Sequence, residues 1–278
     1  MCTLIAIHRQ ISGAPLVIAA NRDEYHDRPA AAPACIQHPD GGTRILAPRD
    51  LRAGGTWLGL NPDGVFAAIT NRPNPQPDAS RRSRGLLVLD ALAFSSAAKA
   101  AAKFESLGPD LYNPFNLFVA DTNDAFVVVS HAGQVRVERL EPGVHVIGNA
   151  EPNDLSHPKT RRTLASVRSL VGEDAGTAAA KSCDQLMAAL GELCRSHDTS
   201  EATTESLAPL GAICVHHEGY GTRSSTLLRL GEDPQQSELY YSDGAPCVTP
   251  YENLTPLIQE LSRTASYEGS GSMARKAS

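Results

Sequence analysis

Short apolar runs separated by turn-forming residues fill most of this chain, and this spacing limits its fold more than any other feature. Each run has the length of a β-strand, and a cluster such as Asn61-Pro62-Asp63-Gly64 between two runs favours a tight turn. The predicted strands cover residues 3–8, 16–20, 56–60, 65–70, 116–121, 125–130, 134–139, 144–147, 212–216, 225–230 and 238–242. Because most of these runs are joined by short turns, we expect antiparallel hairpins and meanders.

Helical spacing of apolar residues occurs in fewer, longer segments. Within residues 183–194, Leu186, Leu190 and Leu193 share one face of a helix, as expected for a side that packs on a sheet. The predicted helices cover residues 85–93, 95–105, 159–170, 183–194 and 254–262. Strands and helices cluster instead of alternating strictly, so the sequence predicts an α+β fold with antiparallel sheets covered by helices. We expect one domain over residues 1–263 and a disordered, Gly-Ser-containing tail over residues 264–278.

Composition and charge argue against several classes of function. A formal net charge of −6 and an isoelectric point near 5.8 do not provide the basic surface that nucleic acids require. We interpret the Arg-Arg-Ser-Arg cluster at residues 81–84 as the solvated start of a helix. The sequence shows no apolar run of membrane-spanning length and no signal-peptide pattern, so we expect a cytoplasmic protein without stable membrane insertion.

The cysteines and histidines show none of the close spacings that are typical of metal sites. The six cysteines, at positions 2, 35, 183, 194, 214 and 247, form no CxxC pair, which argues against a structural zinc site and a disulfide framework. His216 and His217 are adjacent, so on a strand they would point to opposite faces. The sequence contains no phosphate-binding glycine loop and no haem-attachment motif. We therefore predict no metal and no resident cofactor, and consider haem only as a ligand.

Cys2 directly follows the initiator methionine, at the start of the first predicted strand. Without Met1 this residue would carry both a thiol and a free α-amine, whose ordinary pKa values are near ~8.5 and ~7.7–8.0. Nucleophile and general base would then share one residue, as in hydrolases that use an N-terminal Thr or Cys. The alternative, which position alone favours, is a small buried hydrophobic residue at a strand start.

Six motifs follow one another along the chain. They are Asn21-Arg22-Asp23-Glu24, Gly54-Gly55-Thr56-Trp57-Leu58-Gly59, Thr70-Asn71-Arg72, Tyr112-Asn113-Pro114-Phe115-Asn116-Leu117, Gly148-Asn149-Ala150 and Tyr220-Gly221-Thr222-Arg223-Ser224-Ser225-Thr226. In this order they resemble the NRDE family, also called the transport-and-Golgi-organisation family, from residue 1 to about residue 255. That family is similar to the N-terminal-nucleophile (Ntn) hydrolases, especially choloylglycine hydrolase and penicillin V acylase. The resemblance implies a four-layer αββα fold, with two antiparallel sheets stacked between helix layers.

The resemblance also implies a set of catalytic residues. It makes Cys2 the nucleophile, Asp23 the residue that orients the α-amine, and Asn71 an oxyanion donor. Asn149 corresponds to a second asparagine of the hydrolases, and Arg223 to a late arginine that would neutralise a carboxylate or fix Asp23. We assign three further residues to substrate binding: Asn21, Arg22 and Trp57.

One departure from the hydrolase pattern bears on the chemistry. The hydrolases carry an arginine three residues before the aspartate, where this chain has Ala20, and Arg22 stands directly before Asp23 instead. If the strand continues through this point, Arg22 and Asp23 point to opposite faces and do not both face Cys2. The polar site residues also have structural alternatives, as turn formers, caps or solvated charges, and Trp57 has one at a sheet edge.

Two functions fit this sequence. The first is a Cys2-dependent hydrolase of a linear amide, ester or thioester, acting on C–N bonds other than peptide bonds. The second is a non-catalytic carrier on the same fold, suggested by Ala20 and by the links of some family members to haem trafficking and to lipid or acyl-CoA handling. Either function predicts a small-molecule amide, acyl or haem-like ligand.

Overall fold

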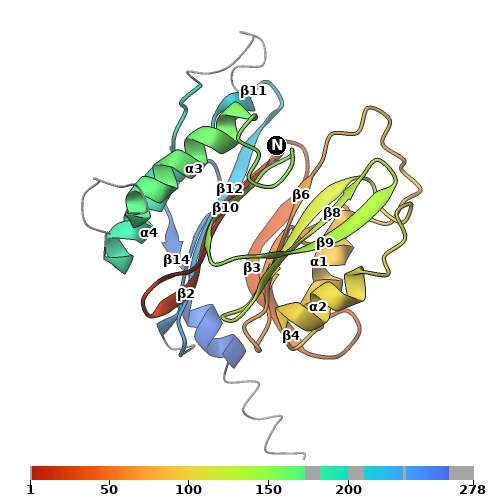
Figure 1. The fold of residues 1–278 in the computed structure, drawn as a ribbon, viewed down its shortest axis with the longest axis horizontal. Helices are drawn as coiled ribbons and strands as arrows, with labels where there is room; N and C mark the ends of the chain where they lie inside the picture. Colours follow the sequence, from red (N-terminus) through yellow and green to blue (C-terminus); the bar gives the residue numbers. More distant parts are fainter. Residues whose placement is uncertain (1, 173–181, 200–209, 234–235, 263–278) are drawn as a thin grey trace, which may run out of the picture.

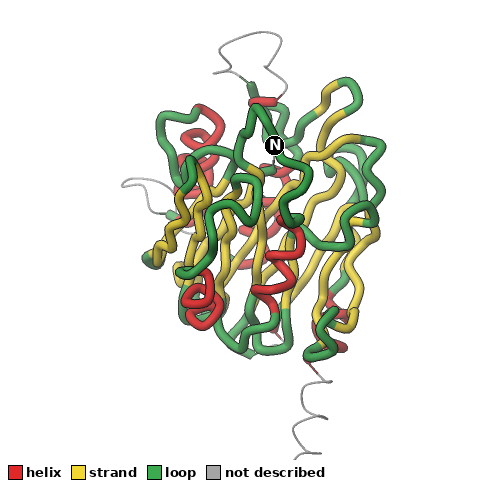
Figure 2. The backbone as a smooth tube through the Cα atoms, turned by 90° about the vertical axis from the view of Figure 1, so that its right-hand side faces the viewer, coloured by secondary structure: helices red, strands yellow, loops and turns green. Residues whose placement is uncertain are grey.

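The computed structural model describes residues 2–172, 182–199, 210–233 and 236–262. Two antiparallel sheets lie face to face, and helices cover the outer side of each sheet (Figure 1). A view turned by 90° shows the strands running side by side through the middle of the molecule (Figure 2). The predicted α+β class and four-layer αββα arrangement are therefore confirmed. The predicted tail, residues 264–278, lies outside the described residues.

Sheet A contains the chain's first strands and its last ones. Its strand order is β10 (Gly143–Ile147), β1 (Thr3–Ile11), β2 (Ala14–Tyr25), β12 (Tyr220–Leu230), β13 (Glu238–Ser242) and β14 (Glu252–Asn253), with β11 (His216–His217) paired to β12. Helices α3 (Pro158–Val171) and α4 (Cys183–Cys194) cover its outer face. Strands that lie far apart in sequence, β2 and β12, are thus neighbours at the centre of this sheet.

Sheet B is a meander in which each strand pairs with the next strand along the chain. Its strands are β3 (Ala30–Gln37), β4 (Arg44–Asp50), β5 (Leu58–Leu60), β6 (Phe66–Asn71), β7 (Phe115–Ala120), β8 (Ala125–His131) and β9 (Gln134–Leu140). Helices α1 (Arg84–Leu92) and α2 (Ala97–Phe104) cover its outer face. This order agrees with the short turns that the sequence places between the apolar runs.

The alternation of side chains along β1 explains how the layers pack against each other. Leu4 and Ala6 point to the other sheet, where they join a core that includes Phe66 and Phe118. Ile5 and Ile7 point to the opposite side and pack with residues of α3 and α4. Both faces of this strand are buried, which accounts for its continuous apolar sequence.

The structure corrects several strand predictions. β3 and β4 were not predicted. β3 is rich in alanine and contains Pro33, so its sequence lacks the residues typical of a strand. A proline is tolerated in a strand at a sheet edge or a bulge, and β3 is an edge strand. The register of β3 shifts between Ala31 and Ala34, beside this proline. β2 extends to Tyr25, beyond the predicted 16–20. The predicted strand 212–216 is wrong, since in this region only His216–His217 pair as a strand.

The predicted closing helix is confirmed, since residues 255–262 are helical. Among the described residues, no helix combines the length and the apolar character that crossing a membrane requires.

Gly55 brings the start of α1 against the loop that precedes β5. Thr56 N–H donates a hydrogen bond to the Gly85 carbonyl at 3.1 Å, and a Cβ added to Gly55 would lie 2.7 Å from that carbonyl oxygen. A side chain at Gly55 must therefore push the two backbones apart.

We predict that Gly55→Ala lowers the free energy of unfolding by about 1–3 kcal/mol, the usual cost of inserting an atom into packed backbone. Gly42→Ala is the matched control, because an added Cβ there meets no atom within 4 Å. Urea denaturation of both variants checks this, and an equal loss in the two would contradict it.

Candidate active site

Cys2 lines a cavity of about 480 Å³ at the end of the sheets, which we call the Cys2 cavity. Asp23, Asn71, Arg22 and Trp57 line the same cavity. The structure thus brings together three of the five predicted catalytic residues and two of the three predicted substrate-binding residues.

The Cys2 thiol is partly shielded from solvent and held by a hydrogen bond. Cys2 is half-buried, and its Sγ donates to the backbone carbonyl of Asp23 at 3.8 Å. Burial raises the pKa of the Cys2 thiol, and the negative charge of Asp23 adds to the rise. In the chain that retains Met1, the thiol is therefore mostly protonated at neutral pH.

The carboxylate of Asp23 is fully buried on the helix side of sheet A. Thr222 Oγ1 donates to its Oδ1 at 2.6 Å, and Lys159 Nζ lies 3.9 Å from its Oδ2. Burial raises the pKa of Asp23 and lowers the pKa of Lys159, in each case against the attraction of the partner. At this distance the attraction is about 4 kcal/mol with an effective dielectric constant of ~20. Because desolvation costs several kcal/mol for each ion, stability alone does not account for this buried pair.

Arg22 and Asp23 lie on opposite faces of β2. The strand continues through both residues, so Arg22 enters the space between the sheets, where its guanidinium stacks on Trp57 at 4.2 Å from the ring centre. This outcome is the one expected for a continuing strand. Trp57 is a wall of the Cys2 cavity, as assigned, and not merely a sheet-edge residue.

Positive charge gathers around the Cys2 cavity. Six arginines line it: Arg22, Arg28, Arg52, Arg81, Arg82 and Arg84. Five of them have an ion-pair partner: Arg28 with Asp50, Arg52 with Asp27, Arg81 with Asp110, Arg82 with Asp90 and, at a longer distance, Arg22 with Glu24. The cluster at residues 81–84 is thus part of a cavity wall and not only the solvated start of a helix.

Among the cavity arginines, Arg22 and Arg84 have charges that nearby carboxylates neutralise least. Arg22 lies 3.9 Å from its ion-pair partner Glu24. Arg84 donates to the Pro114 carbonyl at 2.9 Å, and no carboxylate pairs with it within the described part of the chain. Burial lowers the pKa of both guanidinium groups, so each is a partly desolvated cation beside Cys2.

A loop from sheet A holds Asn71 in place at the end of β6. The Nδ2 group of Asn149 donates to the backbone carbonyl of Asn71. The loop itself is fixed because Thr70 Oγ1 donates to the Gly148 carbonyl at 2.5 Å and Asn116 Nδ2 donates to the same carbonyl at 3.0 Å. The side chain of Asn71 makes no hydrogen bond to another described residue, so its amide is available to a ligand. Asn149 supports Asn71 and is not itself a cavity wall.

Two predicted site residues have other positions. Arg223 does not contact Asp23; it lines a second cavity of about 340 Å³, because a register shift in β12 between Thr222 and Ser224 leaves Arg223 outside the strand pairing. Asn21 is buried on the helix side, and its Nδ2 donates to the carbonyls of Cys194 and Ile213 at 2.9 and 3.0 Å. These hydrogen bonds join sheet A to the segments around α4, so Asn21 has a structural role.

Sequence reasoning missed three contributors to the site: Thr222, Lys159 and Arg84. Thr222 lies inside one of the quoted motifs, directly before Arg223, but only the β12 bulge shows which of the two faces Asp23. Lys159 follows Pro158 in the first turn of α3, and nothing in its sequence context indicates that its ammonium group is buried.

The sequence profile of the family described as Transport and Golgi organisation 2 matches residues 1–239. The chain belongs to this family. It is 30% identical over 236 residues to the human Transport and Golgi organization protein 2 homolog, covering 78% of this chain and 83% of the human protein. The Bos taurus homolog is 29% identical over 236 residues, with the same coverage of 78% and 83%. The resemblance inferred from the motifs is therefore confirmed.

A solved structure agrees with this fold. The Caenorhabditis elegans N-acylethanolamine-hydrolyzing acid amidase (NAAA) ortholog superimposes with a TM-score of 0.52, covering 82% of this chain and 92% of that chain. The two sequences are 13% identical, so this likeness shows the fold alone. This member of the Transport and Golgi organisation 2 family has the Ntn-hydrolase-like fold.

We predict that alkylation of Cys2 by iodoacetamide accelerates steadily with pH in a chain whose N-terminal tag keeps the Cys2 nitrogen in a peptide bond. Because the thiol pKa is raised, the thiolate is scarce at neutral pH, and the rate should still be rising at about pH 9, above the ordinary thiol pKa of ~8.5. Peptide mapping by mass spectrometry measures the rate at Cys2. A plateau below about pH 8 would show that the pKa is not raised.

Proposed function

We propose that this protein is an N-terminal-nucleophile hydrolase that uses Cys2 to cleave a linear amide, ester or thioester. The observation that supports this most is the convergence of Cys2, the Asp23 backbone and Asn71 on one cavity. These residues come from β2, β6 and the start of β1, on two different sheets. A nucleophile and a free amide donor lie at one cavity, and the buried Asp23 carboxylate lies behind them on the helix side of sheet A. A nucleophile and an oxyanion donor are groups that acyl transfer uses.

The proposed reaction begins with removal of Met1, which frees the α-amine of Cys2. The amine takes the thiol proton, and the sulfur attacks the substrate carbonyl carbon. The Asn71 amide donates to the oxyanion that forms. The intermediate collapses by breaking the bond to the leaving group, which receives the proton from the amine. Water then attacks the thioester, releases the carboxylic acid and restores the thiol.

Asp23 has a positioning role in this proposal. The register that pairs Thr3 with Asn21 carries the chain end towards Asp23, so the freed amine of Cys2 would lie near a carboxylate. Thr222 and Lys159 hold that carboxylate, and Lys159 balances its charge. The ammonium form of Cys2 would in turn favour the thiolate, opposing the effect of burial.

The cavity walls favour a substrate that carries a negative charge. Arg22 and Arg84 are partly desolvated, and α1 begins at Arg84 with the positive end of its dipole at the cavity. A carboxylate or phosphate on the substrate would pair with both guanidinium groups. The proposed substrate is thus an anionic acyl compound.

We predict that the mature protein lacks Met1 and that an activated ester, p-nitrophenyl acetate, acetylates Cys2. Intact mass gives the state of the N-terminus, and peptide mapping locates the acetyl group. Cys2→Ser should lose thiol acylation at this position. The matched control is Cys35→Ser, which removes a half-buried thiol that donates a hydrogen bond to the Leu257 carbonyl. This control should keep the acetylation of Cys2. Retention of Met1, or equal labelling of both variants, would overturn the proposal.

Asn71→Leu is the informative companion variant in the same assay. Loss of one oxyanion donor should slow acylation by about 10²–10³-fold. Because Asn71 is exposed at the end of β6, the variant is expected to keep the circular dichroism spectrum of the parent. An unchanged acylation rate would remove Asn71 from the mechanism.

A second candidate function, a carrier of haem or an acyl-CoA-like anion, is favoured by the raised pKa of the buried Cys2 thiol, which opposes nucleophilic attack. The arginines would then bind the ligand's carboxylate or phosphate groups. Haem titration followed by absorbance separates the two functions. Micromolar binding that survives Cys2→Ser and weakens in Arg84→Met supports the carrier, and an absent Soret shift excludes haem.

A further inference from the structure

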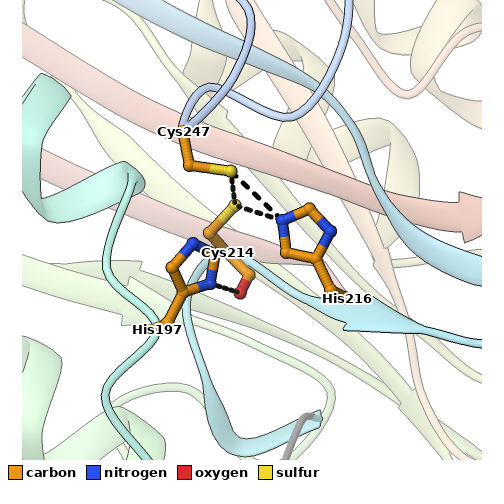
Figure 3. A group of neighbouring side chains, drawn as sticks. All are labelled: His197, Cys214, His216 and Cys247. Carbon is orange, nitrogen blue, oxygen red and sulfur yellow. Dashed lines mark hydrogen bonds between the residues drawn. The ribbon is translucent and has the colours of Figure 1, made fainter.

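Four metal-ligating side chains meet outside the Cys2 cavity. They are His197, Cys214, His216 and Cys247 (Figure 3). Their four ligand atoms all lie within 4.8 Å of one another. His197 follows α4, Cys214 precedes β11, His216 begins β11, and Cys247 belongs to the loop after β13, so three separate segments contribute.

We propose that these four residues bind one zinc ion with a Cys₂His₂ ligand set. Two thiolates and two imidazoles are a set that structural zinc sites use, and the mixed sulfur and nitrogen donors suit zinc better than calcium or magnesium. This proposal does not depend on the proposed hydrolase function.

The distances fit a tetrahedral ion. Zn–S bonds of about 2.3 Å at tetrahedral angles place two sulfurs about 3.8 Å apart, and a sulfur and a nitrogen slightly closer. The Sγ atoms of Cys214 and Cys247 are 3.6 Å apart. Nε2 of His216 lies 3.8 Å from the Cys214 sulfur and 3.1 Å from the Cys247 sulfur. These three ligand atoms thus need only small shifts to surround an ion, and the His197 ligand atom lies within 4.8 Å of each of them.

His197 has the hydrogen bond that a zinc-bound histidine usually makes. Its Nδ1 lies 3.0 Å from the backbone carbonyl of Cys214. A carbonyl oxygen only accepts, so Nδ1 carries the proton and Nε2 of the neutral ring keeps a free lone pair. An imidazole fixed in this way through its other nitrogen is typical of metal ligands.

The cysteines are suited to a metal and not already used by a disulfide. All six cysteines of the chain are free thiols in this structure. Cys214 is completely buried, whereas His197 and His216 are exposed, so the ion can enter from the histidine side. Four protein ligands fill a tetrahedral zinc, which leaves no position for a substrate. The site is therefore structural.

Zinc at this position would brace the Asp23 site. Val215, between the two ligands Cys214 and His216, accepts a hydrogen bond from Thr222 N–H and donates one to Thr222 Oγ1, each at 2.8 Å. The same Oγ1 donates to Asp23. The ion would thus fix the segment that keeps Thr222 against the buried carboxylate.

The test uses the full chain, purified under reducing conditions, stripped with a chelator and then offered Zn²⁺. We expect one zinc per chain by elemental analysis, and a melting temperature that rises with added zinc, because the ion binds only the folded state. Co²⁺ in place of Zn²⁺ should give the thiolate charge-transfer absorption and the intense visible bands of a four-coordinate ion.

Matched variants locate the site. Cys247→Ser and His197→Ala should each lower zinc affinity by at least about tenfold, whereas Cys35→Ser and His217→Ala should retain it. His217 is the neighbour of His216, and its Nδ1 lies 3.3 Å from the Glu218 carbonyl, outside the four-residue cluster. Because His197 is exposed, its variant should fold. Binding below about a tenth of an equivalent in the reduced parent, equal affinity in Cys247→Ser, or a Cys214–Cys247 disulfide that persists in place of zinc would each overturn the proposal.

Discussion

The pairing of β2 with β1 on one side and β12 on the other is the constraint on which the candidate site depends. Side chains on a strand alternate between two faces, so this register sends Asp23 towards α3 and Arg22 into the space between the sheets. A shift of one residue would exchange them, putting a carboxylate between the sheets and a guanidinium beneath the helices. Cys2 lies at the end of the neighbouring strand, where its thiol reaches the Asp23 backbone and the cavity that Arg22 lines.

Buried charge is the feature that distinguishes this site from the surrounding core. Lys159 and Asp23 are both almost fully buried, and burial shifts the pKa of each towards its neutral form. Such a pair contributes little to stability, because desolvation cancels most of the attraction. The pair thus keeps a carboxylate close to Cys2 and shielded from water. The proposed zinc ion fits this view, since it would stiffen the segment that carries the hydrogen bonds to Thr222 and, through it, to Asp23.

Most of the fold could be predicted from local patterns, and the failures have physical causes. The turns and apolar runs identified the meander of sheet B from β6 onwards, and the helical spacing identified α3 and α4, because both signals depend on residues close in sequence. β3 could not be recognised because its alanines and Pro33 lack the β-branched and aromatic residues typical of strands. The sequence did not decide whether β2 extends through the Asn21-Arg22-Asp23-Glu24 motif, because its polar residues are compatible with a turn as well as with a strand. Pairing with β12 makes this segment a strand.

The order of apolar and turn residues by itself determined that helices cover antiparallel sheets, since burial of an alternating strand or an amphipathic helix needs only one face to be apolar. The four-layer arrangement came from the family resemblance. The position of Cys2 and the family resemblance likewise singled out Cys2, Asp23 and Asn71. Tertiary structure alone decided that Thr222, and not Arg223, faces Asp23, because that choice depends on a bulge against a distant strand. It alone also gathered the four proposed zinc ligands, which come from three separate segments and therefore share no spacing that a sequence could reveal.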